Sequence, residues 1–180
     1  MYTIHEGAPA DPRPENEAAV YAFLSRLSIP FTRIDHEPVR TMEDCEAIDR
    51  ALGGEICKNL VLCNQQKTTF YLLMIHETKA FRTKDVSKQL GVSRLSFASP
   101  EHMQALLHLS PGAASPMGLL FPSARDVRLV IDRDVVQSEY LGCHPCVNTA
   151  SIRMPMADFL NVYLPAVHHA PTFVTIPASY

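Results

Sequence analysis

The chain has 180 residues, of which 47% are hydrophobic and 19% are charged, and its formal net charge is −3. This length fits one domain with a sizeable core, and the composition is that of a globular protein without low-complexity segments. No apolar run reaches the roughly 20 residues that a membrane-spanning helix needs. The mild negative charge gives no global indication of nucleic-acid binding, although such binding requires only a local basic face.

The N-terminal segment 1–16 contains acidic side chains and three prolines. It lacks the basic start and the apolar stretch of a signal peptide. The five cysteines cannot all pair with one another, so we expect reduced thiols in a cytoplasmic protein. We interpret 1–180 as a single domain in which residues 1–13 form a flexible arm.

In the first third of the chain, capping residues and periodicity predict two helices. The first covers 14–27, where apolar residues recur at i, i+3, i+4 and i+7. The second begins at Thr41, which forms a near-capping box with Asp44, and ends at Gly53-Gly54. A short strand is predicted between the two helices, over 31–36.

The clearest β signal is a hairpin formed by two apolar runs, 56–63 and 69–76, that five polar residues separate. Both runs are apolar enough for central strands. Further helices are predicted over 83–90, 99–109 and 155–164, and further strands over 94–98, 127–132, 147–153 and 172–176. Strands and helices mix without regular βαβ alternation, so we predict an α+β domain with a mixed sheet.

Lys58 is an anomaly, because it interrupts an otherwise apolar run from Ile56 to Leu62. A lysine with such neighbours commonly sits on the outer face of a strand with its ammonium group in water. The alternative is a cation at the rim of a pocket, where it meets an anionic or carbonyl oxygen. Spacing alone leaves both interpretations open.

The loop 112–118, with the sequence Gly-Ala-Ala-Ser-Pro-Met-Gly, is a second candidate. Its small residues let a substrate approach the backbone and leave N–H groups available to an oxyanion. An ordinary surface connection has the same composition, so the loop alone is a weak signal. The residues to which we assign substrate contacts here are Gly112, Ala113, Ser115, Pro116 and Gly118.

His144 and Asn148 lie four residues apart across a proline turn, so both could face one cleft and orient a water or a substrate. A lone histidine is more often only a satisfied polar residue. Cys143 and Cys146 flank His144 as a C-x-x-C pair, which in thiol–disulfide oxidoreductases opens a helix. Here β-branched residues follow the pair and indicate a strand. A zinc site would lack a second pair of ligands, so we predict no metal.

Basic side chains cluster between Lys79 and Arg94, where Asp85 is the only acidic residue. A basic run is usually a solvated face, but it is also what a phosphate backbone requires. We therefore assign contacts with the phosphates of a nucleic acid to Lys79, Arg82, Lys84 and Lys88.

Taken together, these residues resemble the prolyl-tRNA editing family (YbaK/ProX-like, the prolyl-tRNA-synthetase-associated domain), and most closely its stand-alone branch that deacylates Ala-tRNA(Pro). The resemblance covers roughly 17–176. Its motifs, in chain order, are Lys58-Asn59-Leu60, then 94–101, then Gly112 with 115–119, and finally His144-Pro145 with 148–151. Each motif is weak by itself, but four in the right order are specific. Cys143 and Cys146, where apolar residues are more usual, and Ser151, in place of threonine, depart from the pattern.

The resemblance implies a mixed, partly closed sheet packed by helices and a pocket for the aminoacyl end of a charged tRNA. It implies that Lys58 is central to activity, that Asn59 and the Gly112 loop contact the amino acid, and that His144 and Asn148 wall the other side. We expect Lys58 to bind the terminal phosphate or ribose, and the loop amides to hold the carbonyl oxygen. His144 and Asn148 would orient water or the amino group.

The resemblance further implies that there is no cofactor and that the partners are mischarged proline tRNA and prolyl-tRNA synthetase, without a membrane or DNA. Two alternative functions remain open from the sequence. One is an inactive paralogue that binds tRNA or a synthetase. The other is a redox protein that uses Cys143 and Cys146.

Overall fold

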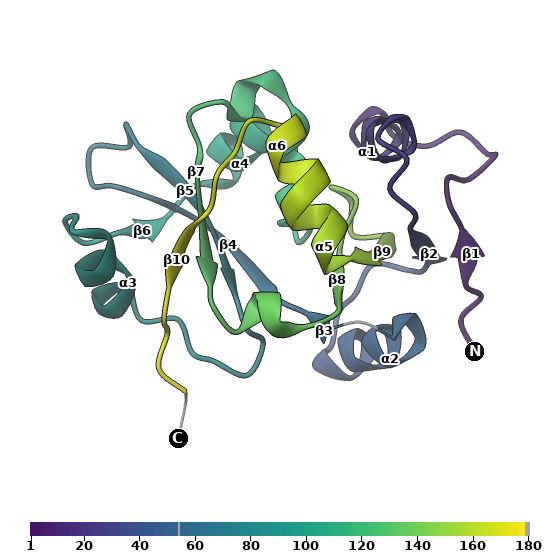
Figure 1. Ribbon diagram of the computed structural model, residues 1–180, viewed down its shortest axis with the longest axis horizontal. Coiled ribbons are helices and arrows are strands. Elements are labelled where there is room, and N and C mark those ends of the chain that lie inside the picture. The colour runs from purple at the N-terminus through teal and green to yellow at the C-terminus, as the bar shows by residue number, and fades with distance from the viewer. Residues whose placement is uncertain (54, 179–180) are drawn as a thin grey trace.

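Ten strands form two five-stranded sheets within residues 1–53 and 55–178, the part of the chain that the computed structural model describes (Figure 1). The first sheet has the order β1 (His5–Glu6), β2 (Thr32–Asp35), β9 (Ala150–Pro155), β8 (Tyr140–Cys143) and β3 (Glu55–Ile56). The second has the order β10 (Thr172–Val174), β7 (Arg128–Asp132), β5 (Phe70–Ile75), β4 (Lys58–Cys63) and β6 (Ser96–Phe97). Each sheet contains parallel and antiparallel pairs. The predicted α+β class with mixed sheets packed by helices is confirmed.

Helices cover the sheets, and those over 42–52 and 83–90 end at Gly53 and Gly91 as predicted. The helix that was predicted through Leu109 ends at Leu107. The helices are α1 (Glu15–Arg26), α2 (Met42–Leu52), α3 (Thr83–Leu90), α4 (Pro100–Leu107) and a C-terminal helix made of α5 (Met156–Asp158), a π-helical turn (Phe159–Tyr163) and α6 (Leu164–Ala166). Thr41 Oγ1 accepts a hydrogen bond of 3.1 Å from the Asp44 amide, and Gly53 ends α2 with a φ of 74°. Gly54, also expected at this boundary, lies outside the described residues. Among the described helices, none is long and apolar enough to cross a membrane.

The predicted strand 56–63 is divided between the two sheets. β3 pairs with β8 in the first sheet, whereas β4 pairs with β5 in the second, so the chain crosses from one sheet to the other at Cys57. Lys58 is therefore the first residue after the crossover. Because strand pairing depends on distant partners, the apolar pattern alone did not reveal the break.

The segment around the C-x-x-C pair also differs from the prediction. The predicted strand 147–153 begins only at Ala150, and the strand β8, which was not predicted, precedes it. The cause is a tight turn at 144–149 in which Cys146 has a φ of 66°. This turn makes β8 and β9 an antiparallel pair.

Residues 1–13, which the sequence suggested as a flexible arm, carry β1, and β1 pairs with β2. The Arg13 guanidinium bonds the Asp35 carboxylate at 2.8 Å, and it also bonds Glu17 in α1 at 2.9 Å. These contacts connect the segment to the first sheet and to the first helix.

The two faces of β5 contact two separate cores, as expected for a central strand. Leu72 and Met74 belong to the main core, which also contains Phe159 and Tyr163 of the C-terminal helix. Leu73 and Ile75 belong to a smaller core beneath α3, together with Leu62, Val86, Leu95 and Val174. The second sheet therefore lies between the main core and α3.

Candidate active site

A cavity of about 560 Å³ opens where α2, the crossover at Cys57, the loop after β5 and the 144–151 segment meet. Lys58 and His144 both line it. Polar side chains on its wall are Glu46, Asp49, Lys58, Glu77, Thr78, His144 and Ser151; apolar side chains on its wall are Val39, Met42, Ile48 and Ile56. The structure thus brings two of the three predicted catalytic residues to one cavity.

The Lys58 side chain is exposed, and its Nζ donates a hydrogen bond of 2.9 Å to the backbone carbonyl of Lys79. This single bond fixes the direction of the ammonium group. An ammonium group carries three donors, so two remain for a ligand at the cavity. Of the two interpretations that spacing left open, the geometry favours the cation at the rim of a pocket.

His144 is half-buried beside its turn. Its Nδ1 lies 2.9 Å from the Ala150 carbonyl oxygen and 3.4 Å from Ser151 Oγ. A carbonyl oxygen only accepts, so Nδ1 carries the proton and Nε2 of the neutral ring is an acceptor. Burial lowers the pKa of His144, the Ala150 carbonyl partly offsets this effect, and His36 lowers the pKa further. His144 is therefore a neutral base at pH 7.

Ser151 connects His144 to a second histidine that the sequence did not single out. His36 Nε2 lies 2.9 Å from Ser151 Oγ, and the ring centroids of His36 and His144 are 6.1 Å apart. His36 follows β2 and Ser151 belongs to β9, and these neighbouring strands place the two side chains together. The contact between His36 and Ser151 could not be recognised in the sequence, because more than a hundred residues separate the two strands.

Three carboxylates that were not predicted line the same cavity, at Glu46, Asp49 and Glu77. Desolvation, followed by the negative charges of Glu77 and Glu46, raises the pKa of Asp49 to about 6. Glu46 and Asp49 are three residues apart on α2 and so share one helix face. This face of α2 makes one side of the cavity acidic.

The loop 112–118 packs against the His144 turn. Ser115 is fully buried, its Oγ donates to the His144 carbonyl oxygen, and it accepts from the Met117 amide at 3.1 Å. An ideal Cβ on Gly112 would lie 3.5 Å from Asn148 Nδ2. The hydroxyl of Ser115 therefore joins two segments of the backbone, which argues against a role as a nucleophile.

Gly112 itself lines a second cavity, of about 650 Å³, between the loop and α4. In the part of the chain that the structure describes, neither this loop nor Asn148 lines the Lys58 cavity. Gly112 and Asn148 thus lie close to each other. The Ala113 amide already donates to the Ser110 carbonyl at 3.1 Å, so it is not free to hold an oxyanion.

Four further residues that were assigned substrate contacts have partners within the protein. Ala113, Pro116 and Gly118 are buried, and a Cβ on Gly118 would lie 2.6 Å from the Leu107 carbonyl oxygen. Asn59 Nδ2 donates to the Cys57 carbonyl at 3.5 Å, within the crossover. These contacts favour packing roles for all four residues over the expected substrate contacts.

Three thiols around the site, those of Cys57, Cys143 and Cys146, are buried, whereas Cys45 on the cavity wall is partly exposed. Desolvation raises the pKa values of Cys57 and Cys143 to about 12 and that of Cys146 further. Reactive thiols have lowered pKa values because the thiolate is the nucleophile. The geometry therefore disfavours the redox alternative.

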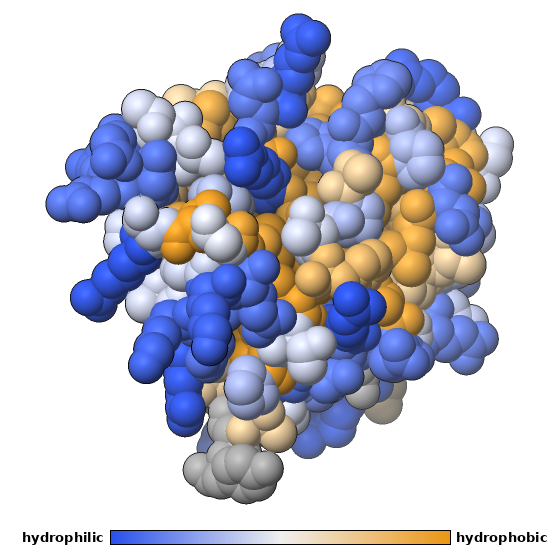
Figure 2. Space-filling model, turned by 60° about the vertical axis from the view of Figure 1, so that its left-hand side comes forward, coloured by the Kyte–Doolittle hydropathy of each residue, from blue (hydrophilic) through white to orange (hydrophobic). Residues whose placement is uncertain are grey.

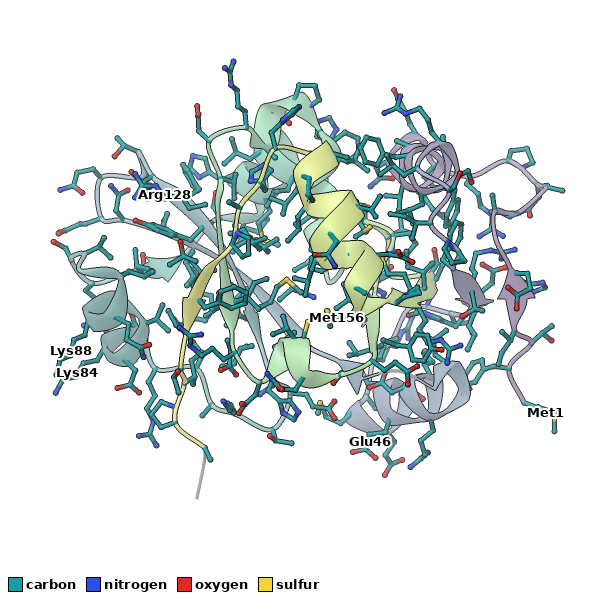
Figure 3. The ribbon with its side chains drawn as sticks, in the orientation of Figure 1. Met1, Glu46, Lys84, Lys88, Arg128 and Met156 are labelled. Carbon is teal, nitrogen blue, oxygen red and sulfur yellow. The ribbon has the colours of Figure 1, made fainter. Side chains whose placement is uncertain are left out.

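The predicted tRNA-binding residues divide into one buried and three exposed side chains. Lys79 is 5% exposed, and its Nζ lies 3.0 Å from Asp132 and 2.7 Å from Asp134. This ion pair favours a structural role over the expected contact with tRNA. Arg82, Lys84 and Lys88 are exposed, and Figure 3 shows Lys84 and Lys88 pointing away from α3.

Known proteins share sequence and fold with this chain. The model of the aminoacyl-tRNA editing domain family matches residues 36–162. The chain is 34% identical over 140 residues to the prolyl-tRNA editing protein ProX of Acetoanaerobium sticklandii, which covers 78% of this chain and 85% of that protein. It is 29% identical over 170 residues to prolyl-tRNA synthetase associated domain-containing protein 1 of Danio rerio, and this match covers 93% of this chain and 89% of that protein.

A solved structure described as a trans-editing enzyme for prolyl tRNA synthetase has the same fold. It superposes with a TM-score of 0.68 at 16% identity, over 92% of this chain and 100% of the other. The family match spans more than half of the chain and includes Lys58, the Gly112 loop and His144. The chain therefore belongs to the family of aminoacyl-tRNA editing domains.

Proposed function

We propose that the protein is a trans-editing deacylase that hydrolyses the ester of mischarged proline tRNA, with alanine as the amino acid removed. The observation that carries this proposal is the cavity in which the fixed cation of Lys58 and the neutral base His144 face the same space. The names of the relatives, one a prolyl-tRNA editing protein and one a prolyl-tRNA synthetase associated protein, support proline tRNA as the substrate and the synthetase as a partner.

An aminoacyl ester is already activated, so the enzyme needs only to position it, stabilise the developing oxyanion and place a water. In our proposal Lys58 binds the terminal phosphate or ribose of the acceptor end with its two remaining N–H donors. His144 Nε2 accepts a hydrogen bond from the attacking water and takes up its proton. The 2′-hydroxyl of the terminal ribose, which is adjacent to the ester, assists this step.

The apolar side of the cavity holds the amino-acid side chain. It consists of Val39, Met42, Ile48 and Ile56. An apolar pocket rejects a larger side chain by steric clash far better than it rejects a smaller one. We therefore propose that proline is excluded by size and that alanine is accepted.

The test is a deacylation assay with proline tRNA charged with alanine, serine, cysteine or proline. We expect the alanyl ester to be cleaved fastest and the prolyl ester to persist. Rapid cleavage of the prolyl ester would overturn the assignment of specificity. Binding of charged tRNA without hydrolysis of any ester would instead establish the inactive paralogue.

A further inference from the structure

Phe97 is an exposed aromatic residue on β6, the edge strand of the second sheet. Its side chain is 64% exposed. Its ring forms an edge-to-face pair with Phe81, with 5.6 Å between the ring centroids. The two rings line a hollow of about 300 Å³ together with Thr83, Arg94 and Ser96. Two phenylalanine rings beside an open hollow give a partner a flat apolar surface to contact.

The surroundings of the aromatic pair are positively charged. Arg94 lines the hollow, Arg82 is the neighbour of Phe81 in the chain, and Lys84 and Lys88 are exposed on α3. Asp85 is the only acidic residue between Lys79 and Arg94. None of these four cations forms an ion pair with another residue in the described part of the chain. Figure 2, which brings this side of the molecule forward, shows apolar surface between hydrophilic side chains. An anionic partner with flat apolar groups complements such a surface.

The sheet register places Phe97 on the same face as Lys58. Phe97 is paired with Leu62 in β4, and paired residues of neighbouring strands point to the same face. Side chains alternate along a strand, so Lys58, Leu60 and Leu62 also share a face. Four residues of strand separate Lys58 from Leu62, or about 13 Å. The face between them is covered, because Leu60 and Leu62 pack in the core beneath α3, so a ligand that reaches both Lys58 and Phe97 runs over the surface above this core.

We propose that the hollow between Phe81 and Phe97 is a stacking site for an unpaired base in the single-stranded 3′ end of the tRNA. Arg82 and Arg94 would contact the flanking phosphates. The inference rests on the proposed function, because it places the tRNA end at Lys58. Aromatic rings beside cations bind single strands by stacking, whereas the bases of a duplex are already stacked on each other. A phenylalanine ring has no hydrogen-bonding group, so the site tolerates any base.

The chain contains no tryptophan, so the Phe97→Trp variant would carry a single fluorophore at the site. We expect a single-stranded oligoribonucleotide that ends in CCA to quench its fluorescence, and a blunt RNA duplex of equal charge to quench it much less. The matched control is Tyr2→Trp, next to the N-terminus, which Figure 1 shows on the side of the molecule away from α3. Equal quenching by strand and duplex, or equal quenching in both variants, would overturn the stacking site.

A second measurement uses catalysis. Loss of one stacked base weakens binding roughly 5-fold or more, so Phe97→Ala should raise the KM for Ala-tRNA(Pro) by that factor. The same variant should cleave an alanyl ester without nucleotides at the wild-type rate, and Phe97→Tyr should restore the KM for tRNA. An unchanged KM in Phe97→Ala would overturn the inference while leaving the proposed function intact. If the wild-type protein cleaves no ester, the proposed function fails, and the fluorescence measurement still tests the stacking site.

Discussion

Replacing Lys58 with alanine tests the assignment of the active site most directly. The substitution removes an ammonium group whose one partner within the described chain is the Lys79 carbonyl. The side chain is exposed, so the loss of this bond should lower the free energy of unfolding by about 1 kcal/mol at most. A hydrogen bond from a cation to an anionic ligand contributes about 1.5–3 kcal/mol. We therefore expect kcat/KM for Ala-tRNA(Pro) to fall roughly 10- to 150-fold or further.

The assay is single-turnover deacylation of Ala-tRNA(Pro), run beside thermal unfolding of each variant. Lys67→Ala is a matched control, because Lys67 is an exposed lysine in the turn of the same hairpin and lies outside the cavity. It removes the same charge, so we expect its rate and stability to remain close to those of the wild type. Lys58→Arg keeps the charge and should retain part of the activity.

A wild-type rate in folded Lys58→Ala would refute the role of this lysine. An equal loss in Lys67→Ala would show that overall charge, rather than the cavity, governs the rate. A large drop in stability of Lys58→Ala alone would mean that the bond to the Lys79 carbonyl maintains the fold. These three results are distinguishable because the rate and the unfolding midpoint are measured on the same samples.

Four further predictions follow from other parts of the structure. Replacement of Arg82, Lys84 and Lys88 together by alanine should raise the KM for charged tRNA. It should also reduce the slope of the logarithm of the affinity against the logarithm of the salt concentration by about 1 per lost phosphate contact. Equal losses on a small ester would refute this. Gly118→Ala places a Cβ 2.6 Å from a backbone oxygen and should lower the free energy of unfolding by about 1–3 kcal/mol in denaturant titrations. An unchanged midpoint would show that the loop can move away. The pKa of His144 is lowered, so deacylation should persist below pH 6.5 and fall only as the pH drops through the lowered pKa; a loss that begins above pH 6.5 would contradict a neutral base. Asp49 has a pKa raised from 3.8 to about 6, so its ionisation disfavours the folded state and stability is lost as the pH rises through this range. The difference corresponds to about 3 kcal/mol, which solvent screening of this half-buried group reduces to about 1 kcal/mol. Asp49→Asn should therefore raise the free energy of unfolding at pH 7.5 by that amount and leave it unchanged at pH 3.

Helix boundaries were predictable because their causes are local. The bond from the Asp44 amide to Thr41, and the left-handed conformations of Gly53 and Gly91, each involve residues within one turn of the chain. The strand β8 could not be recognised in the same way. It is four residues long and contains Gly142, and glycine lowers the strand propensity of so short a segment. Its pairing with β3 and β9 stabilises it, and a local pattern does not record those partners.

The candidate site was predictable to the extent that single residues looked unusual in their surroundings. Lys58 stood out in an apolar strand, and His144 stood out in a proline turn. Lys79 looked like another surface cation, but its carboxylate partners are Asp132 and Asp134, more than fifty residues away. His36, Asp49 and Glu77 carried no signal, because an acidic or histidine side chain on a polar segment is ordinary until the fold places it in a cavity.

The crossover at Cys57 explains why the cavity lies where it does. A chain that leaves one sheet and enters the other must separate the two sheets locally, and α2, which precedes the crossover, contacts β2 and β9 of the first sheet. The gap is therefore bounded by the first sheet, by α2 and by the start of the second sheet. Lys58 is the first residue of the second sheet, and the 144–149 turn connects two strands of the first. The position of the cation relative to the histidine is thus set by the geometry of the two sheets and of the short turn that carries His144. Substitutions at Cys57 that disturb the crossover, such as a bulky apolar residue, should therefore impair deacylation by displacing Lys58 even though the thiol has no chemical role.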